Sequence, residues 1–463
     1  MKNTFTLLFL LITGFHGLSQ DWSALGDGTG TNQKVIAMES FQGKLIVGGS
    51  FILAGGQVVN RIASWDGSSW QPMGTGFDDE VRAMAVYNGD LYAAGRFNND
   101  GSGTVPYAGI AKWNGATWLA IPVPDPLSYD YRAMYVLNGE LYATKHTYYS
   151  KFVVKVSKFN GSVWGDLPGE FTGPENYRYL YALGEYQGKL VAGGVFDSVN
   201  GTIAQRVAMF DGTNWTGLNF PVAGPSGGIL EGKVYAFKEF EGKLFVGGIF
   251  ANFQDTIFGS SVASYDGSQW KAYPFDGNLG AIVYDFKIFK DNLIASGDFG
   301  YWQGSNIVST CVMFDTGSSN NWSSLNFYNP LGSSNMNGQS LAIVNGTLYI
   351  GGRFDYAGTP STPVHNVARF TGDLPTGVKH PKRATSVMVY PNPANKTIIP
   401  DPQFLRTNHD VMARIIDIQG REVLRRKMTK AGINIEELVP GLYTMILESA
   451  KSNFIARFVK SDH

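Results

Sequence analysis

Trp22-Ser23-Ala24-Leu25-Gly26 is the first of a series of tryptophan segments along this 463-residue chain. Six further tryptophans hold the equivalent place, each after a turn that begins with an aromatic residue and carries Asp or Asn: Trp70, Trp118, Trp164, Trp215, Trp270 and Trp322. No such turn precedes Trp22, and a seventh turn, at Phe370-Thr371-Gly372, has no tryptophan behind it. The first strand is therefore predicted to complete the last repeat. Joining the two ends in one sheet closes a ring and removes the exposed edge of an open array.

A hairpin signal lies in every repeat. Asn-Gly and related pairs stand between alternating apolar residues, where Gly accepts the positive φ of a tight turn. The leucines that follow these turns are Leu45, Leu91, Leu141, Leu190, Leu244, Leu293 and Leu348. The strand after the turn mostly ends in Gly-Gly-x-Phe, as at Gly48-Gly49-Ser50-Phe51. Paired glycines at a strand end allow a bulge or close packing of neighbouring backbones.

Seven repeats of four short strands predict an all-β chain: a seven-bladed β-propeller closed by an N-terminal strand, plus a small C-terminal Ig-like β-sandwich. A β-solenoid is the competing fold, but its coils are shorter and it leaves Trp22 unexplained. We expect a signal peptide at 1–19, the propeller at 20–371, a Pro/Gly-rich linker at 372–385 and the C-terminal domain at 386–463.

Composition agrees with this fold and excludes several classes of protein. Charged residues make up only 16% and aromatic residues 14%, with 57 Gly, which argues against disorder, a coiled coil or a helical bundle. The net charge is −1, so a nucleic-acid partner held through its phosphates has little support. Cys311 is the single cysteine, and the chain cannot form an internal disulfide.

The N-terminus predicts export. Lys2 precedes the apolar run from Phe5 to Ile12, and small residues at Gly17 and Ser19 suit cleavage before Gln20. A core strand is the alternative for this run. It is too short to anchor the chain in a bilayer, and no second apolar stretch is long enough to cross one. We expect a monomer.

The repeat resembles a known family of propellers. Gly-x-Leu-(Tyr/Ile/Val)-x-Gly-Gly-x-Phe, followed by aromatic-Asp-Gly-x-x-Trp, is similar to the kelch-type repeat and to the propeller of fungal cortical cell-polarity marker proteins and related bacterial extracellular proteins. The resemblance covers Gln20 to about Thr371 and implies a fold rather than an activity, because kelch-like rings include binding modules, scaffolds and enzymes. Kelch-like copper oxidases need Tyr, His and Cys ligands, and the one cysteine here lies far from the histidines in sequence.

The tail carries a more specific resemblance. Val389-Tyr390-Pro391-Asn392-Pro393-Ala394, the strand pattern from Ala413 to Val423 and Leu438-Val439-Pro440-Gly441-Leu442-Tyr443 resemble the C-terminal type A sorting domain of the type IX (Por) secretion system of Bacteroidetes. The resemblance implies export through the type IX machinery as a partner, with release or attachment at the outer-membrane surface, and often removal of this domain. An ordinary accessory Ig-like domain is the alternative.

Candidate site residues come from positions that vary between repeats and reach the face where the loops gather. One set follows the second Gly of the Gly-Gly pair: Ser50, Arg96, His146, Val195, Ile249, Asp298 and Arg353. The other set lies near the start of each first strand: Ile36, Arg82, Arg132, Tyr181, Tyr235, Tyr284 and Gln339. From these and the neighbouring loops we predict ligand contacts by Arg82, Arg96, Tyr131, Tyr177, Tyr181, Tyr235, Tyr284, Asp298 and Arg353.

The third repeat departs most from the pattern and supplies the weak catalytic candidates. Tyr faces can stack on sugars and Arg can hold acidic groups, while His, Tyr or Lys can serve as the base of a polysaccharide lyase. The candidates are His146, Tyr148, Tyr149, Arg132 and Arg178. The alternative is that these are ordinary solvated loop residues, with tyrosines packed between repeats.

Other chemical signals are weak. Asp78-Asp79-Glu80 could touch a calcium ion, but its spacing lacks the alternating ligands and central Gly of a calcium loop, and a solvated turn is the alternative. We find no phosphate loop, zinc spacing or nucleophile elbow, and expect no metal and no cofactor.

Three functions stay open at this point. The first is a secreted or cell-surface module that binds a glycan or a protein through its loop-rich face. The second is an extracellular carbohydrate-active enzyme, a lyase or glycosidase, with its site near the second to fourth repeats. The third is a structural surface protein with no small ligand.

Overall fold

The structure is a computed structural model, and it describes residues 21–374 and 385–461 apart from short gaps. The gaps are 124–128, 148–153, 174–177, 222–231, 251, 254–256, 259–260, 274–280, 300, 304–305, 309, 316–321, 326, 328–336, 359–361, 387–388, 401–410, 418–421, 430–431 and 449–452. The chain divides into two compact units, Met1–Gly377 and Val378–His463. The predicted signal peptide lies outside the described residues.

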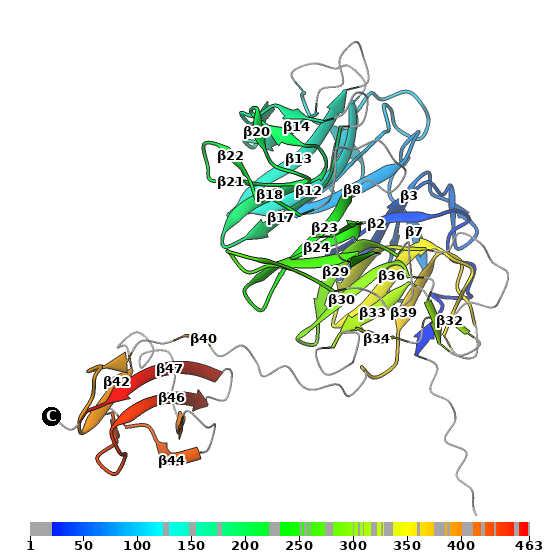
Figure 1. Cartoon of the computed structure of the whole chain (residues 1–463). Coiled ribbons are helices and arrows are strands. Elements are labelled where there is room, and N and C mark those ends of the chain that lie inside the picture. Colours follow the sequence, from blue (N-terminus) through cyan, green and yellow to red (C-terminus); the bar gives the residue numbers. More distant parts are fainter. Residues whose placement is uncertain are drawn as a thin grey trace, which may run out of the picture. The chain divides into compact units, whose positions relative to one another are not determined.

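The described part of the first unit contains seven four-stranded antiparallel sheets (Figure 1). Six follow chain order, each made of four strands that pair with their neighbours: β2 (Val35–Phe41), β3 (Lys44–Gly49), β6 (Ile62–Trp65), β7 (Trp70–Pro72); β8 (Val81–Tyr87), β9 (Asp90–Gly95), β10 (Ile110–Trp113), β11 (Trp118–Ala120); β12 (Tyr129–Leu137), β13 (Glu140–Thr147), β14 (Val154–Phe159), β15 (Trp164–Asp166); β17 (Tyr179–Tyr186), β18 (Lys189–Val195), β21 (Val207–Phe210), β22 (Trp215–Gly217); β23 (Lys233–Phe240), β24 (Lys243–Ile249), β27 (Val262–Tyr265), β28 (Trp270–Ala272); β29 (Ile282–Phe289), β30 (Asn292–Asp298), β33 (Cys311–Phe314), β34 (Trp322–Ser324).

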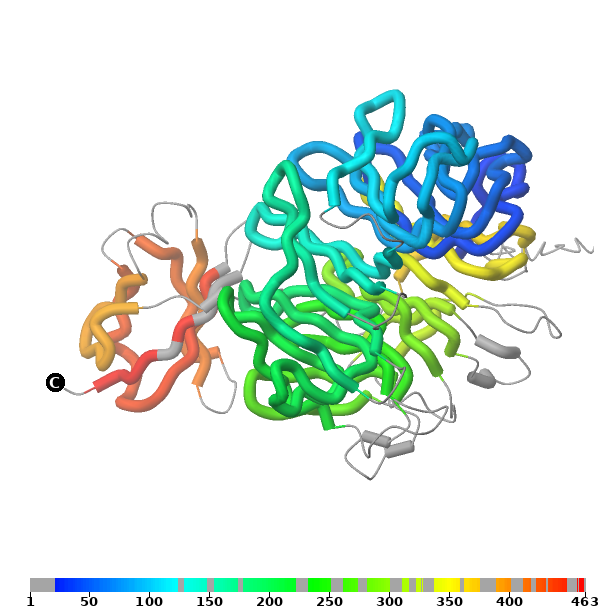
Figure 2. Tube along the Cα trace, turned by 90° about the horizontal axis from the view of Figure 1, so that it is seen from above, coloured from blue at the N-terminus to red at the C-terminus, as the bar shows by residue number. Residues whose placement is uncertain are grey.

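The seventh sheet joins the two ends of the unit. It consists of β35 (Asn337–Val344), β36 (Thr347–Arg353), β39 (Val367–Phe370) and, on its outer edge, β1 (Trp22–Ser23). The first strands of the seven sheets contact one another in cyclic order, from β2 through β35 and back to β2. Figure 2 shows the blue start of the unit beside its yellow end. The sheets therefore form a closed ring, and the predicted all-β propeller fold is confirmed.

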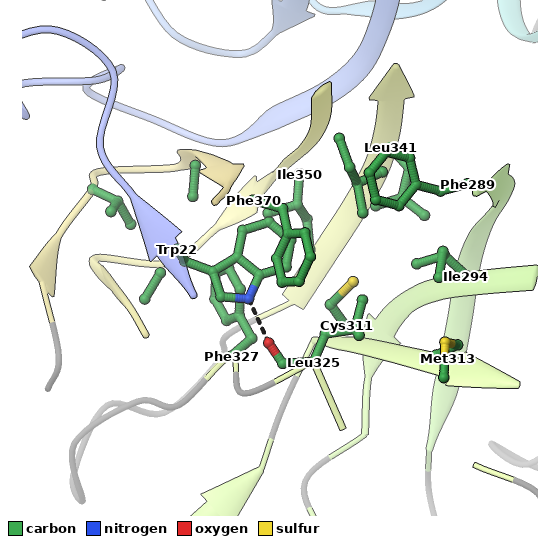
Figure 3. Close-up of a cluster of buried hydrophobic side chains, with 14 of the residues drawn as sticks. Trp22, Phe289, Ile294, Cys311, Met313, Leu325, Phe327, Leu341, Ile350 and Phe370 are labelled. Atoms are coloured by element: carbon green, nitrogen blue, oxygen red, sulfur yellow. Dashed lines mark hydrogen bonds between the residues drawn. The ribbon is translucent and has the colours of Figure 1, made fainter. Parts of the chain in front are cut away.

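Trp22 makes the contacts that close the ring (Figure 3). It pairs with Phe370 in the sheet and is fully buried. Its indole N–H donates to the carbonyl of Leu325, 2.6 Å away, in the preceding sheet. Trp118 and Trp270 repeat this bond, donating to Met73 at 3.0 Å and Leu218 at 2.8 Å. Trp22 thus takes the place of the seventh repeat's tryptophan, as its position in the sequence predicts.

A β-bulge recurs near the start of every first strand. In the fifth sheet Val234 pairs with Gly248 and Ala236 with Gly247, which leaves Tyr235 as the extra residue. The other first strands shift register at the equivalent point. A Cβ on Gly248 would stand well inside 3.0 Å of the Lys233 carbonyl oxygen. The second Gly of the Gly-Gly pair is therefore needed because the bulge brings backbone against it.

The first Gly of the pair serves the packing between sheets. A Cβ on Gly247 would meet the Val283 side chain of the next sheet, and a Cβ on Gly351 would meet Val35 across the closure. The third sheet lacks both glycines. There the bulge is wider, and the Thr144 hydroxyl accepts hydrogen bonds from the backbone N–H groups of Arg132 and Ala133. Both expectations for the glycine pair, a bulge and close packing, are confirmed.

Short strands decorate the connections in the first unit. They lie mainly between the second and third strands of a sheet: β4 (Leu53–Ala54), β5 (Gln57–Val58), β16 (Phe171–Thr172), β19 (Ser198–Val199), β20 (Thr202–Ile203), β25 (Asn252–Phe253), β26 (Ile257–Phe258), β31 (Tyr301–Gln303), β32 (Asn306–Val308), β37 (Tyr356–Ala357) and β38 (Thr362–Pro363). All of these pair antiparallel within their small sheets.

The second unit contains a five-stranded and a three-stranded sheet. Their strands are β40 (Thr385–Ser386), β47 (Asn453–Lys460), β46 (Gly441–Glu448), β43 (Met412–Ile416) and β44 (Glu422–Lys427), and β41 (Val389–Tyr390), β42 (Thr397–Pro400) and β45 (Ile433–Asn434). Ile398 and Ile433 from the smaller sheet share one core with Ile415, Met445 and Phe458 from the larger. No helix among the described residues is long and apolar enough to cross a bilayer.

Candidate functional site

A cavity of about 620 Å³ lies between the first strands of the seven sheets. All seven strands contribute lining residues, and the seven residues at the bulges are among them: Ile36, Arg82, Arg132, Tyr181, Tyr235, Tyr284 and Gln339. We call these seven residues the bulge ring. A bulge turns its extra residue away from the normal alternation of a strand, so a bulge repeated in every sheet aims equivalent side chains at one central space. The structure thus brings together a set that the sequence singled out.

A buried carboxylate holds the two arginines of the ring. The Asp130 side chain is fully buried and accepts from Arg82 Nη1 at 2.5 Å and Arg132 Nη2 at 2.7 Å. Arg82 also pairs with Glu80 at 2.9 Å, and Lys34 lies 3.4 Å from the same carboxylate group. Both guanidinium groups are therefore held in place by carboxylates of the protein.

Tyrosines continue the ring from Arg132. Its guanidinium lies over the rings of Tyr179 and Tyr181, at 4.8 and 5.2 Å from their centroids. The Tyr181 and Tyr235 centroids are 5.0 Å apart, and those of Tyr235 and Tyr284 are 5.3 Å apart, with tilted planes. These contacts form a continuous aromatic wall on one side of the cavity, supported at its end by the Arg132 cation.

The hydroxyl groups of this wall remain open to a ligand. No described residue hydrogen-bonds with the hydroxyls of Tyr181, Tyr235 or Tyr284. Burial raises the pKa of all three phenols, to about 12 for Tyr284. They therefore stay neutral at physiological pH, and each can donate and accept one or more hydrogen bonds.

A second layer of charged residues lies farther along the cavity wall. Glu39, Asp285 and Lys287 line it. The negative charges of Asp285 and Glu39 raise the pKa of Lys287 against the effect of its burial, while burial raises the pKa of Glu39. Asp285 accepts the backbone N–H of Leu341 at 2.8 Å, which ties the sixth sheet to the seventh. Opposite charges therefore lie together in this layer, as they do around Asp130.

His146 lies outside the cavity lining. It is only 2% exposed, and its Nε2 is 3.1 Å from the Leu180 carbonyl and 3.3 Å from the Leu180 N–H. Burial, with the nearby Arg132 charge, lowers the pKa of His146 to about 3. The imidazole is neutral and shielded between the third and fourth sheets, which argues against the role of lyase base that the sequence suggested.

The remaining candidates are dispersed. Tyr131 is fully buried in the core between the second and third sheets, and its packing there explains why it cannot reach a ligand. Arg96 pairs with Asp79 at 2.7 Å, and Arg353 is exposed. Asp298 is half-buried, and burial raises its pKa. Arg178 is partly buried, at the edge of a gap, whereas Tyr148, Tyr149 and Tyr177 lie outside the described residues.

The acidic cluster of the second sheet is occupied by protein groups. Asp78 accepts the Asn98 N–H at 2.9 Å, while Asp79 and Glu80 pair with Arg96 and Arg82. Within the described ranges, no three His, Cys, Asp or Glu side chains are placed to hold a metal ion.

Sequence reasoning missed several residues of the cavity. The sequence analysis gives Asp130 no role, although its carboxylate pairs with both arginines. The charged layer also escaped, yet Glu39 and Lys287 stand three residues after Ile36 and Tyr284 in the same repeat alignment. Comparing the repeats at that offset would have found both.

The comparisons with known proteins concern the tail and the fold. Residues 388–461, in the second unit, match the family described as the secretion system C-terminal sorting domain. This match indicates secretion and attachment at the cell surface through the type IX system. No curated protein matches the chain.

Several solved structures are similar at low identity. PorZ, an essential surface component of the type IX secretion system of Porphyromonas gingivalis, is 15% identical, with 93% of this chain and 59% of that chain covered and a TM-score of 0.44. The extracellular domain of the BT4673 two-component system of B. thetaiotaomicron is 10% identical over 96% and 60%, with a TM-score of 0.48. The GH74 enzyme of Niastella koreensis is 12% identical over 93% and 65%, at 0.46. The chain spans about three fifths of the length of the first two, and the likeness is one of fold.

Proposed function

We propose that the propeller is a surface-displayed binding module whose ligand, a glycan, occupies the central cavity. The observation that carries this proposal is the bulge ring, because it gathers three tyrosine hydroxyls without a described partner in one cavity. The volume of about 620 Å³ falls within the range of roughly 300 to 1,000 Å³ that small-ligand sites occupy.

The chemistry of the cavity supports a glycan more than a protein. Aromatic faces pack against the C–H surfaces of a sugar ring, while hydroxyl and amide groups bond to its hydroxyls. The aromatic residues of the ring lie in the wall of a narrow central space. Protein interfaces place their aromatic anchors on a broad patch of roughly 800 Å² per partner, which a cavity of this size does not offer.

Binding by a matched set of variants tests the proposal. The secreted full chain, with Tyr235→Ala and Arg353→Ala variants, is titrated calorimetrically with a panel of plant and marine oligosaccharides. We expect at least one saturable ligand, weakened tenfold or more by Tyr235→Ala and less than twofold by Arg353→Ala, because Arg353 is exposed outside the cavity lining. If no oligosaccharide saturates, the proposal fails and a structural surface protein remains. A ligand indifferent to Tyr235→Ala would move the site elsewhere.

An enzymatic role has less support. The candidate base His146 is buried and lies outside the cavity lining. A lyase or glycosidase would release new unsaturated or reducing ends from a polysaccharide, and Arg132→Ala would abolish that release. We expect no release by the wild-type protein.

The finer architecture and processing belong to the same proposal. Seven sheets in cyclic contact support a seven-bladed ring of kelch-like type. We propose that residues 1–19 are a cleaved signal peptide, that the type A sorting domain engages the type IX machinery, and that the mature protein is a monomer. Mass spectrometry of the protein recovered from the cell surface would test the cleavage of residues 1–19 and would show whether the sorting domain is also removed.

A further inference from the structure

The geometry points to an uncharged sugar, rather than a uronate or sulfated sugar, as the unit bound in the central cavity. This inference rests on the proposed function and names the ligand class of the same site. It differs from the sequence-based prediction that the arginines hold acidic groups of the ligand.

Both arginines of the bulge ring are already paired with carboxylates of the protein. Asp130 contacts both Arg82 and Arg132 within 2.7 Å, and Glu80 takes a further side of Arg82. An incoming carboxylate would compete with Asp130 for these guanidinium groups, and Asp130 is fully buried and cannot leave without exposing two cations to one another. The Arg132 face is turned instead to Tyr179 and Tyr181.

The other acidic groups around the cavity also oppose an anion. Glu39 and Asp285 line it together with the charge of Lys287, so this layer carries two carboxylates and one cation. Burial raises the pKa of Glu39, in keeping with its place in the cavity wall, where negative charge is poorly solvated. A further negative charge in this space would meet repulsion and an additional desolvation cost.

The cavity also presents neutral hydrogen-bonding groups. They are the hydroxyls of Tyr181, Tyr235 and Tyr284, with the Gln339 amide completing the ring beside them. Their donors and acceptors match the hydroxyls of a neutral sugar, and the adjoining aromatic faces match its apolar surface. The cavity would hold about 20 waters at roughly 30 Å³ each, which suits a short saccharide rather than a wide branched chain.

Salt dependence separates the two classes of ligand. The full chain is titrated with cellotriose, xylotriose, mannotriose and laminaritriose, and with trigalacturonate and an alginate trimer, in 50 and 500 mM NaCl. We expect a neutral trisaccharide to bind with a Kd that changes less than twofold between the two salts. The acidic trimers should bind at least tenfold more weakly. A neutral ligand brings no charge to the site, so salt has little to screen.

The variants Tyr235→Phe and Tyr235→Ala link the result to the cavity. Tyr235→Phe keeps the ring and its packing but removes the hydroxyl, and should weaken the neutral ligand about threefold to tenfold; Tyr235→Ala should weaken it more. An acidic trimer that binds more tightly than every neutral one, and tenfold less tightly in high salt, overturns the inference while the binding module stands. If no trisaccharide responds to either variant, the proposed function falls and this inference with it.

Discussion

The two sets of equivalent positions in the repeats are arranged differently in space. The bulge ring, from the first strands, converges on one cavity in all seven sheets. The set after the Gly-Gly pair, which includes Arg96, His146 and Arg353, scatters into an exposed ion pair, a buried imidazole and a solvated cation. Both sets vary between repeats, so variability alone does not mark a site. A β-bulge that recurs at the same position of every repeat does mark one.

The largest expected effect concerns the ion pairs that belong to each set. Asp130→Asn leaves Arg82 and Arg132 facing each other without their buried carboxylate, and we expect a loss of about 3 kcal/mol in the free energy of unfolding. Asp79→Asn breaks the exposed pair with Arg96 and should cost less than about 1 kcal/mol. Urea unfolding measures both. Equal losses would mean that the buried carboxylate of Asp130 contributes no more to stability than the exposed carboxylate of Asp79.

The next effect concerns the glycine that allows the bulge. Gly248→Ala places a Cβ against the Lys233 carbonyl, and relieving the overlap should cost about 1 to 3 kcal/mol and move Tyr235. Gly165→Ala is the control, since a Cβ there meets open space. Thermal unfolding of the two variants provides the comparison. A Gly248→Ala protein as stable as the control would show that the bulge does not depend on this glycine.

Acid should destabilise the protein through His146, the buried histidine of the second set. The unfolded chain protonates His146 near pH 6.5, whereas the folded chain does so only near pH 3. Between these values the unfolded state binds one more proton, so the free energy of unfolding falls as the pH falls, by up to about 1.4 kcal/mol per pH unit. Relative to His146→Gln, the wild type should lose about 2 to 3 kcal/mol between pH 6.5 and 4.5. Parallel stability curves for the two proteins would show an accessible imidazole.

The smallest expected effect is on ligand affinity and compares one arginine from each set. Arg353→Ala changes an exposed residue of the second set, and the oligosaccharide Kd should stay within a factor of two. Arg132→Lys, in the bulge ring, cannot preserve the planar contact with Tyr179 and Tyr181 and should weaken binding about threefold. Calorimetry at one salt concentration distinguishes them. A larger loss for Arg353→Ala would place the ligand on the loops.

Much of the fold could be predicted from the sequence because its signals repeat. The turn glycines, the Gly-Gly pairs and the displaced Trp22 each specify local backbone geometry, and the structure has that geometry. The site was harder, because the burial of His146 and Tyr131 depends on neighbouring sheets that are distant in sequence. The ion pairs of Asp130 need Arg82, 48 residues earlier in the chain, and the packing of the second sheet against the third brings the two together.

A crystal structure of the full chain with the tightest neutral trisaccharide tests the central claim most directly. Our account predicts sugar density in the central cavity, with a sugar ring packed on Tyr235 and a sugar hydroxyl within hydrogen-bond distance of Tyr181, Tyr235 or Tyr284. Density on the outer loops, with the cavity holding only water, would contradict it.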